Sequence, residues 1–140
     1  MTVDDLLASA RAAIGTPFRH QGRTLRGMDC VGLLIHACSE NGVVPSDVEG
    51  YPPRPSQGML EAVFDSHVES GVLLRLPAND LRAGNFLMMR FGREQQHLAI
   101  CAGDTIIHSY MDVGKVCEHR LDARWRSRII RVYRLTELHE

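Results

Sequence analysis

The chain has 140 residues, of which 44% are hydrophobic and 24% charged, as in a globular domain that buries its own core. Its formal net charge of -1 excludes the basic excess on which nucleic-acid binding depends. The acidic first five residues and the lack of a long apolar run argue against a secretory signal and a membrane span. We therefore expect one domain over residues 1–140, made in the cytoplasm without a signal peptide, and no nucleic-acid or membrane partner.

The first predicted element is a short amphipathic helix. Thr2 and Asp5 match a capping box, and apolar residues then recur at helical spacing over residues 3–14. Residues 16–22 follow as a loop rich in polar groups and helix breakers. Loops of this kind often carry functional residues.

A second helix is predicted to begin at Cys30. Asp29 is a favourable N-cap residue, and apolar residues follow Cys30 at i+3, i+4, i+7 and i+8 before Gly42. Residues 45–55 contain four prolines and are predicted to be an irregular surface segment. A third helix is predicted to begin at Ser56 and to end before Gly71. Five apolar residues are expected on its buried face: Met59, Leu60, Val63, Phe64 and Val68.

The second half of the chain has the pattern of strands. Short apolar runs between Gly, Asp and Asn turns predict strands at 72–76, 86–91, 98–102, 106–109 and 129–135. The basic run from Arg120 to Arg134 is interleaved with apolar residues and predicts the solvated face of a strand. Helices followed by strands indicate an α+β fold, in which N-terminal helices cover one side of an antiparallel sheet.

Cys30 is the candidate nucleophile. Unpaired backbone N–H groups and the helix dipole favour a thiolate in the first turn of a helix, and so lower the pKa of a thiol there. The same N–H groups can receive the oxyanion that forms when the thiolate attacks a carbonyl. We interpret Cys38, Cys101 and Cys117 as packing residues. The chain has no C-x-x-C spacing, so we expect no disulfide. We therefore expect Cys30 to be alkylated fastest.

Two histidines lie on one predicted hairpin. A nucleophilic cysteine needs a base, and the base needs a third group that fixes its tautomer. His97 begins one strand and His108 ends the next, with residues 102–105 as the turn. A two-residue loop at 102–103 sets the histidines opposite each other, and one at 103–104 makes them diagonal neighbours. Either register places both on one face of the sheet.

The remaining histidines give weaker signals. His36, His67 and His139 are predicted to be solvated. His119 follows Glu118 near the end of a strand, where it is either exposed or lines the cleft.

Several stretches together resemble the NlpC-type family of cell-wall peptidases. They are residues 15–22 (GTPFRHQG), 27–33 (GMDCVGL), 97–100 (HLAI) and 106–108 (IIH). The resemblance implies a papain-like cysteine peptidase without cofactor or metal. It assigns Cys30 as nucleophile, His97 as general base and His108 as the residue that orients His97. The implied reaction is cleavage of the γ-D-glutamyl bond to a diamino acid in peptidoglycan stem peptides.

The resemblance is closer to the version of this family that bacteriophages and prophages carry as a tail-assembly or tail-tip peptidase. It rests on the loop from His20 to Arg23, the Tyr51-Pro52 step and residues 125–133. It implies other tail proteins as partners and assembly into a phage tail.

Two positions depart from the family pattern. Many members have a tyrosine where this chain has Phe18, and its hydroxyl helps the oxyanion site. Here His20 or backbone N–H groups would have to serve. Many members also have a serine after the nucleophile that helps bind the free amine of the substrate, where this chain has Val31. With Asp29, these residues are the candidate substrate and oxyanion contacts, and a preference for a free N-terminal L-alanine does not carry over.

Three alternatives stay open. Cys30, His97 and His108 also form a three-ligand set for zinc with an open fourth position. The chain can instead be a structural part of a phage tail without turnover, or an amidase of the related CHAP type that uses the same acyl-enzyme. Permuted acyltransferase relatives place His before Cys and are disfavoured by the order found here.

Overall fold

The computed structural model describes residues 1–48, 50–52, 55, 58–93 and 95–140. Its helices are α1 (Val3–Ala12), α2 (Cys30–Ser39), α3 (Met59–Glu69) and α4 (Ala123–Arg126). Its strands are β1 (Arg23–Thr24), β2 (Gly27–Met28), β3 (Leu73–Leu76), β4 (Phe86–Phe91), β5 (Gln95–Cys101), β6 (Thr105–Tyr110), β7 (Lys115–Arg120) and β8 (Ile129–Leu135).

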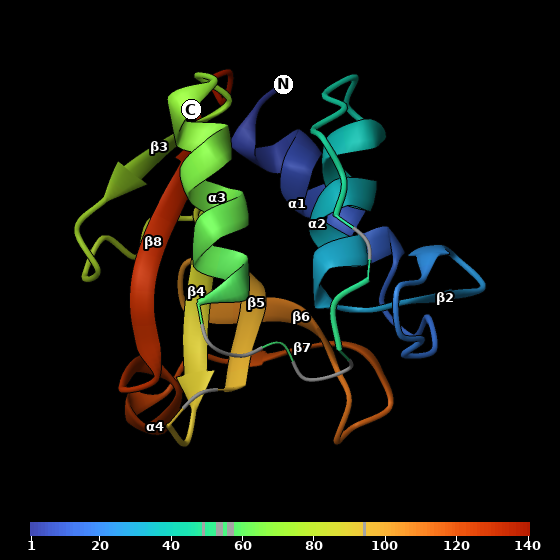
Figure 1. Cartoon of the computed structure of the whole chain (residues 1–140). Coiled ribbons are helices and arrows are strands. Elements are labelled where there is room, and N and C mark those ends of the chain that lie inside the picture. Colours follow the sequence, from blue (N-terminus) through green and yellow to red (C-terminus); the bar gives the residue numbers. More distant parts are fainter. Residues whose placement is uncertain (49, 53–54, 56–57, 94) are drawn as a thin grey trace.

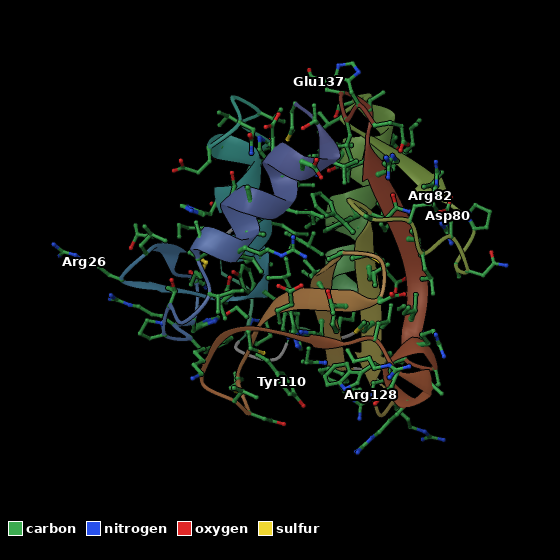
Figure 2. All side chains as sticks on the ribbon, turned by 180° about the vertical axis from the view of Figure 1, so that it is seen from behind. Arg26, Asp80, Arg82, Tyr110, Arg128 and Glu137 are labelled. Carbon is green, nitrogen blue, oxygen red and sulfur yellow. The ribbon has the colours of Figure 1, made fainter. Side chains whose placement is uncertain are left out.

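The main sheet is antiparallel and has the strand order β3-β8-β4-β5-β6-β7. Strands β1 and β2 form a separate small hairpin, and Arg26 at its turn projects away from the rest of the molecule (Figure 2). Figure 1 shows α3 in front of β4 and β8, with α1 and α2 beside it. The predicted α+β, papain-like arrangement of N-terminal helices on an antiparallel sheet is confirmed.

The first four residues of β4, 86–89, are buried on both faces of the sheet, which explains why they are all apolar rather than alternating with polar residues. Phe86 and Met88 belong to the larger core, between the sheet and α1, α2 and α3. Leu87 and Met89 belong to a smaller core on the opposite face, where Trp125 of α4 packs. The sheet therefore carries helices on one face and a short cover on the other.

The predicted helix starts are largely confirmed. Asp5 N–H donates to Thr2 Oγ1 and Thr2 N–H donates to Asp5 Oδ2, which completes the capping box of α1. Asp29 caps α2 and accepts from the N–H of Gly32 at 2.8 Å. Helix α3 begins at Met59, after Gly58 in the left-handed conformation, and Ser56 lies outside the described residues.

The buried face of α3 is narrower than predicted. Leu60 and Phe64 are buried, Val63 and Val68 are half-buried, and Met59 is 38% exposed. Four of the five expected side chains of α3 therefore pack against the larger core, two of them only in part, and Met59 does not. None of the helices in the described ranges combines the length and apolar composition that crossing a membrane requires.

Two predictions about irregular and basic segments need correction. The run 120–134 is not one strand: Asp122 accepts from the N–H of Trp125 and starts α4 before β8 begins. Arg134 is buried rather than solvated, because Asn85 and Glu140 accept hydrogen bonds from its guanidinium. The described residues of 45–55 are irregular as predicted, but Tyr51 is 3% exposed and belongs to the larger core.

Candidate active site

Cys30 lies at the first residue of α2 and is 6% exposed. Three backbone N–H groups form hydrogen bonds with its thiol, those of Cys30, Val31 and Leu98. The first two belong to the start of α2, and the third belongs to β5, the strand that carries His97. The candidate nucleophile thus lies where the start of α2 meets the sheet, with N–H donors from both elements.

The ionisation of Cys30 differs from the sequence-based prediction. Burial, together with the carboxylate of Asp29, raises the pKa of the Cys30 thiol to about 12, although the surrounding N–H groups lower it. The start of the helix therefore acts in the expected direction, but burial outweighs it. The prediction of a net lowering is wrong for the thiol at rest.

His97 extends from β5 and is 6% exposed. Burial lowers its pKa to about 3, and the guanidinium of Arg128 also lowers it, against an opposing effect of Asp112. The imidazole of His97 and the thiol of Cys30 are therefore both uncharged at rest. In this state His97 can take the thiol proton only as the sulfur attacks, which is the role of a general base.

His97 and His108 meet as the hairpin geometry predicted. Cys101 pairs with Ile106, and the N–H of Ala102 donates to the carbonyl of Thr105 at 2.9 Å, so residues 103–104 form the turn. This is the second of the two predicted registers and makes the histidines diagonal neighbours. His97 Nε2 and His108 Nδ1 are 2.6 Å apart.

His119 continues this row of histidines. His108 pairs with Cys117 across β6 and β7, which makes His119 its diagonal neighbour on the same face. The Nε2 atoms of His108 and His119 are 2.8 Å apart, and His119 Nδ1 lies 3.0 Å from the carbonyl oxygen of Arg120. His119 therefore lines the site, which is one of the two placements that its sequence position had allowed.

Aromatic side chains enclose the histidines. Phe91 stacks on His97 at 5.2 Å between ring centroids, and Tyr110 stacks on His108 at 5.1 Å. Trp125 contacts the rings of both His108 and His119, at 5.2 and 4.8 Å. The sequence pattern does not predict this enclosure, because the basic run that contains Trp125 has the pattern of a strand.

Arg128 adds a cation to the same wall. Its guanidinium lies 4.8 Å from the ring centre of Phe91 and 4.5 Å from that of Trp125. Figure 2 shows Arg128 and Tyr110 at the same end of the molecule. This cation, which contributes to the lowered pKa of His97, thus lies close to the site.

The carboxylate of Asp29 is fully occupied. Its Oδ1 accepts from Gly32 N–H at 2.8 Å and from Arg23 Nη1 at 3.0 Å. Its Oδ2 accepts from Gln21 N–H at 2.8 Å and from the hydroxyl of Tyr51. Asp29 therefore joins the loop, the helix and a buried tyrosine, and its charge is balanced by a guanidinium.

The other candidate contact residues have neighbours of their own. Phe18 is half-buried, and its N–H donates to the carbonyl of Gly114 at 2.8 Å. His20 is exposed, and its ring meets the edge of Tyr51 at 5.5 Å. Val31 lines an apolar cavity between α2 and α3. The backbone N–H of Val31 also forms a hydrogen bond with the thiol of Cys30, which lowers the pKa of that thiol.

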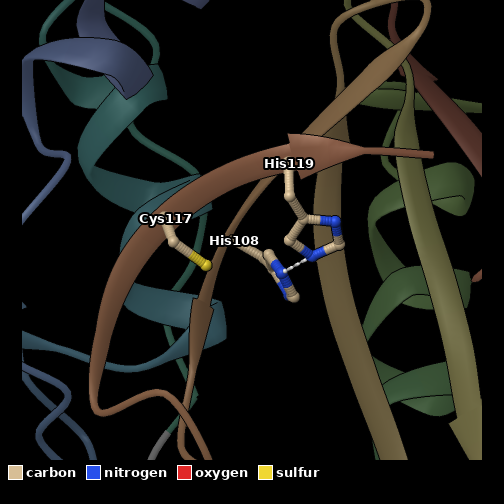
Figure 3. Close-up of side chains that lie close together, drawn as sticks. All are labelled: His108, Cys117 and His119. Carbon is tan, nitrogen blue, oxygen red and sulfur yellow. Dashed lines mark hydrogen bonds between the residues drawn. The ribbon is translucent and has the colours of Figure 1, made fainter.

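One group in the described part of the chain brings three potential metal ligands together, namely His108, Cys117 and His119 (Figure 3). Their ligating atoms lie within 4.8 Å of one another. The set of Cys30, His97 and His108, which the sequence left open for zinc, does not form such a group. Two nitrogens bound to one tetrahedral zinc ion lie about 3.3 Å apart. The 2.8 Å between His108 and His119 is instead a hydrogen-bond distance.

A model of the NlpC/P60 family matches residues 15–134 of this chain. A search of curated proteins found no match. Among solved structures, the NlpC/p60 domain of the peptidoglycan hydrolase SagA is 21% identical, with a TM-score of 0.62 over 94% of this chain and 97% of that one.

Two larger proteins share the same fold. A lipoprotein-like NLP/P60 protein of Staphylococcus aureus is 17% identical with a TM-score of 0.68, over 99% of this chain and 42% of that one. The peptidoglycan hydrolase RipB of Mycobacterium tuberculosis is 16% identical with a TM-score of 0.64, over 96% of this chain and 64% of that one. The present chain therefore spans less than half of the S. aureus protein.

Proposed function

We propose, because this chain belongs to the NlpC/P60 family, that it is a cysteine peptidase that hydrolyses peptidoglycan stem peptides. The observation that carries the proposal is the placement of Cys30 at the start of a helix. Its thiol is hydrogen-bonded to the backbone N–H of Leu98, next to His97, and His97 is hydrogen-bonded to His108. SagA and RipB, which share the fold, are described as peptidoglycan hydrolases, and this supports the substrate class.

The proposed reaction begins with attack of the Cys30 sulfur on a carbonyl carbon. Nε2 of His97 faces His108, so Nδ1 is the ring nitrogen that takes the thiol proton. The N–H groups of Cys30 and Val31 stabilise the resulting oxyanion, in place of the tyrosine hydroxyl that Phe18 lacks.

The tetrahedral intermediate then collapses. The C–N bond breaks, and His97 returns the proton to the leaving amine, which leaves an acyl group on the sulfur. His97 next takes a proton from water as that water attacks the thioester. The second collapse releases a carboxylic acid and restores the Cys30 thiol.

The specific bond that we propose is the one between γ-D-glutamyl and a diamino acid. Recognition of a free N-terminal amine would need an unpaired acceptor near the nucleophile. Asp29 is the carboxylate closest in sequence, and its oxygens are already bonded to Arg23, Gln21, Gly32 and Tyr51. We therefore expect no preference for stem peptides with a free L-alanine amine.

The same proposal includes the phage or prophage context. We propose synthesis in the cytoplasm as one domain over residues 1–140, and assembly with other tail proteins that deliver the peptidase to the wall. The loop from His20 to Arg23, the Tyr51-Pro52 step and residues 125–133 support it, because these stretches resemble the tail-associated version of the family. Co-purification with phage tails from a lysogen, or its absence, tests this part separately.

Digestion of purified muropeptides tests the peptidase proposal. We would incubate wild-type protein, Cys30→Ala and Cys38→Ala with two kinds of substrate, with and without a chelator. In one the N-terminal amine of the stem peptide is joined to the glycan through an amide bond, and in the other this amine is free. Mass spectrometry identifies the products. We expect activity that is lost in Cys30→Ala, retained in Cys38→Ala two turns along the same helix, and unaffected by the chelator.

The products also separate the alternatives. Release of a diamino acid amine identifies the γ-D-glutamyl bond, whereas release of intact stem peptide from the glycan identifies an amidase of the CHAP type. Activity that a chelator abolishes contradicts the metal-free mechanism. No turnover on any of these substrates favours the structural tail protein.

A further inference from the structure

We propose that His119 is a positioning residue that fixes the tautomers of His108 and His97, so that the basic nitrogen of His97 faces Cys30. This inference rests on the proposed cysteine-peptidase function. It adds a fourth member, from β7, to the three residues that the family resemblance assigned.

The direction of the hydrogen bonds is set at the carbonyl of Arg120. A carbonyl oxygen only accepts, so His119 Nδ1, at 3.0 Å, must carry hydrogen and donate to it. A neutral imidazole carries hydrogen on one nitrogen only. Nε2 of His119 is therefore an acceptor.

His108 must then donate from Nε2 to Nε2 of His119, across 2.8 Å. Its Nδ1 is left as an acceptor, and it lies 2.6 Å from His97 Nε2. His97 therefore donates from Nε2, and its Nδ1 carries a lone pair. The backbone carbonyl of Arg120 thus fixes the tautomer of His97 through the rings of His119 and His108.

The opposite order would disable the site. With hydrogen on Nδ1, His108 would donate to His97, and His97 would hold its own hydrogen on the nitrogen that should receive the thiol proton. Nothing in His108 itself prevents this, because either nitrogen of a neutral imidazole can carry the hydrogen. His108 is fully buried, so its hydrogen-bond partners decide its tautomer.

The surrounding structure holds the rings in place for this role. Trp125 packs on both His108 and His119, and the paired strands β6 and β7 fix the two side chains on one face. The order also survives the reaction. When His97 accepts the thiol proton at Nδ1, it still donates from Nε2 to His108, so no proton has to move along the row.

A pair of substitutions tests the proposal. In His119→Gln, the amide oxygen can accept from His108 and the amide N–H₂ can donate to the carbonyl of Arg120, as the native tautomer does. His119→Leu removes both functions at similar volume. We expect Leu to lower kcat by about 10- to 100-fold with little change in KM, and Gln to stay within a few-fold of wild type.

Two further measurements need no peptide substrate, so they test His119 even if the chain proves inactive on muropeptides. Nitrogen-15 NMR of labelled histidine should show a bare Nδ1 in His97 for wild type and Gln, and a mixture of tautomers for Leu. Alkylation of Cys30 by iodoacetamide should slow in Leu alone. Arg120→Ala, which keeps the carbonyl, is the matched control and should leave both readouts unchanged.

Three results would overturn the proposal. They are hydrogen on Nδ1 of His97 in the wild-type spectrum, equal losses in the Gln and Leu variants of folded protein, and a Leu variant with wild-type kcat and alkylation rate. Circular dichroism and thermal unfolding establish that each variant is folded.

Discussion

Cys30 and His97 are both buried, and burial raises the pKa of the thiol but lowers that of the imidazole. A helix start at Cys30 follows from local sequence, because the N-cap and the apolar spacing lie within ten residues. The degree of burial depends on strands about 70 residues away in the chain. Burial decides the direction of the pKa shift at both residues, so the ionisation of the pair could not be predicted from sequence.

Arg128 provides a test of the electrostatics at His97. Burial and the nearby guanidinium both lower the pKa of His97, and the base must be neutral to act. Arg128→Met removes the cation and should raise this pKa, so the acid limb of the kcat/KM profile should move to higher pH. Arg128→Lys keeps a charge and should shift less. An acid limb that moves to lower pH in the Met variant would contradict the assignment.

At the scale of elements, a close contact between Gly22 and Gly32 fixes the position of Cys30. A Cβ on Gly32 would lie 2.1 Å from the carbonyl oxygen of Gly22, so the first turn of α2 approaches the 16–22 loop more closely than any other residue allows. The Asp-Cys-x-Gly sequence therefore has a steric reason. The glycine lets the loop and the helix cap share Asp29.

Gly32→Ala should displace the start of α2. Because the obstructing atom is backbone, we expect at least a 10-fold loss of peptidase activity and a destabilisation of about 1 to 3 kcal/mol. Urea unfolding and muropeptide digestion measure the two effects. Ser39→Ala, at the exposed end of the same helix, should change unfolding by less than about 0.5 kcal/mol. If the Gly32 variant behaved like that control, the contact would not position the nucleophile.

Several elements were not predicted with bounds from the sequence, and two of them, β7 and α4, contribute to the site. Strand β7 has charged residues on most of its exposed positions, and only Val116 on it is buried, so it lacks a strong apolar run. Helix α4 has four residues, too few to show helical periodicity. Because β7 and α4 were not predicted, the sequence could not indicate which residues lie next to His119 and Trp125. His97 and His108 could be paired because only a short hairpin turn separates their strands.

At the scale of the whole molecule, the arrangement of layers was predictable because helical and strand patterns occupy separate halves of the chain. The strand order was not, because β8 inserts between β3 and β4 after a separation of more than 30 residues. The resemblance in residues 15–33 and 97–108 predicts the candidate site without any knowledge of the strand order.

Burial of His97 and His108 should make the fold sensitive to mild acid. Their pKa values are lowered by burial to about 3 and about 2, from an unfolded value near 6.5. Between pH 6.5 and 5 the unfolded chain takes up protons that the folded chain does not, so the free energy of unfolding falls as pH falls. Each histidine should cost about 2 kcal/mol at pH 5 relative to neutral pH.

Urea unfolding at pH 7 and pH 5 measures this loss. Carboxylates stay charged in both states over this interval, so the histidines dominate it. His97→Gln should remove about half of the loss, and His139→Gln, at an exposed position, should leave it unchanged. A loss of wild-type size in the His97 variant would show that other groups cause the acid sensitivity.

The row of histidines also constrains how this chain can diverge. His97, His108 and His119 stand on three neighbouring strands at intervals of 11 residues. A slip of one residue in either strand pairing would turn a histidine to the opposite face of the sheet. Selection should therefore tolerate side-chain changes in the two hairpin turns far more readily than insertions or deletions that alter strand register.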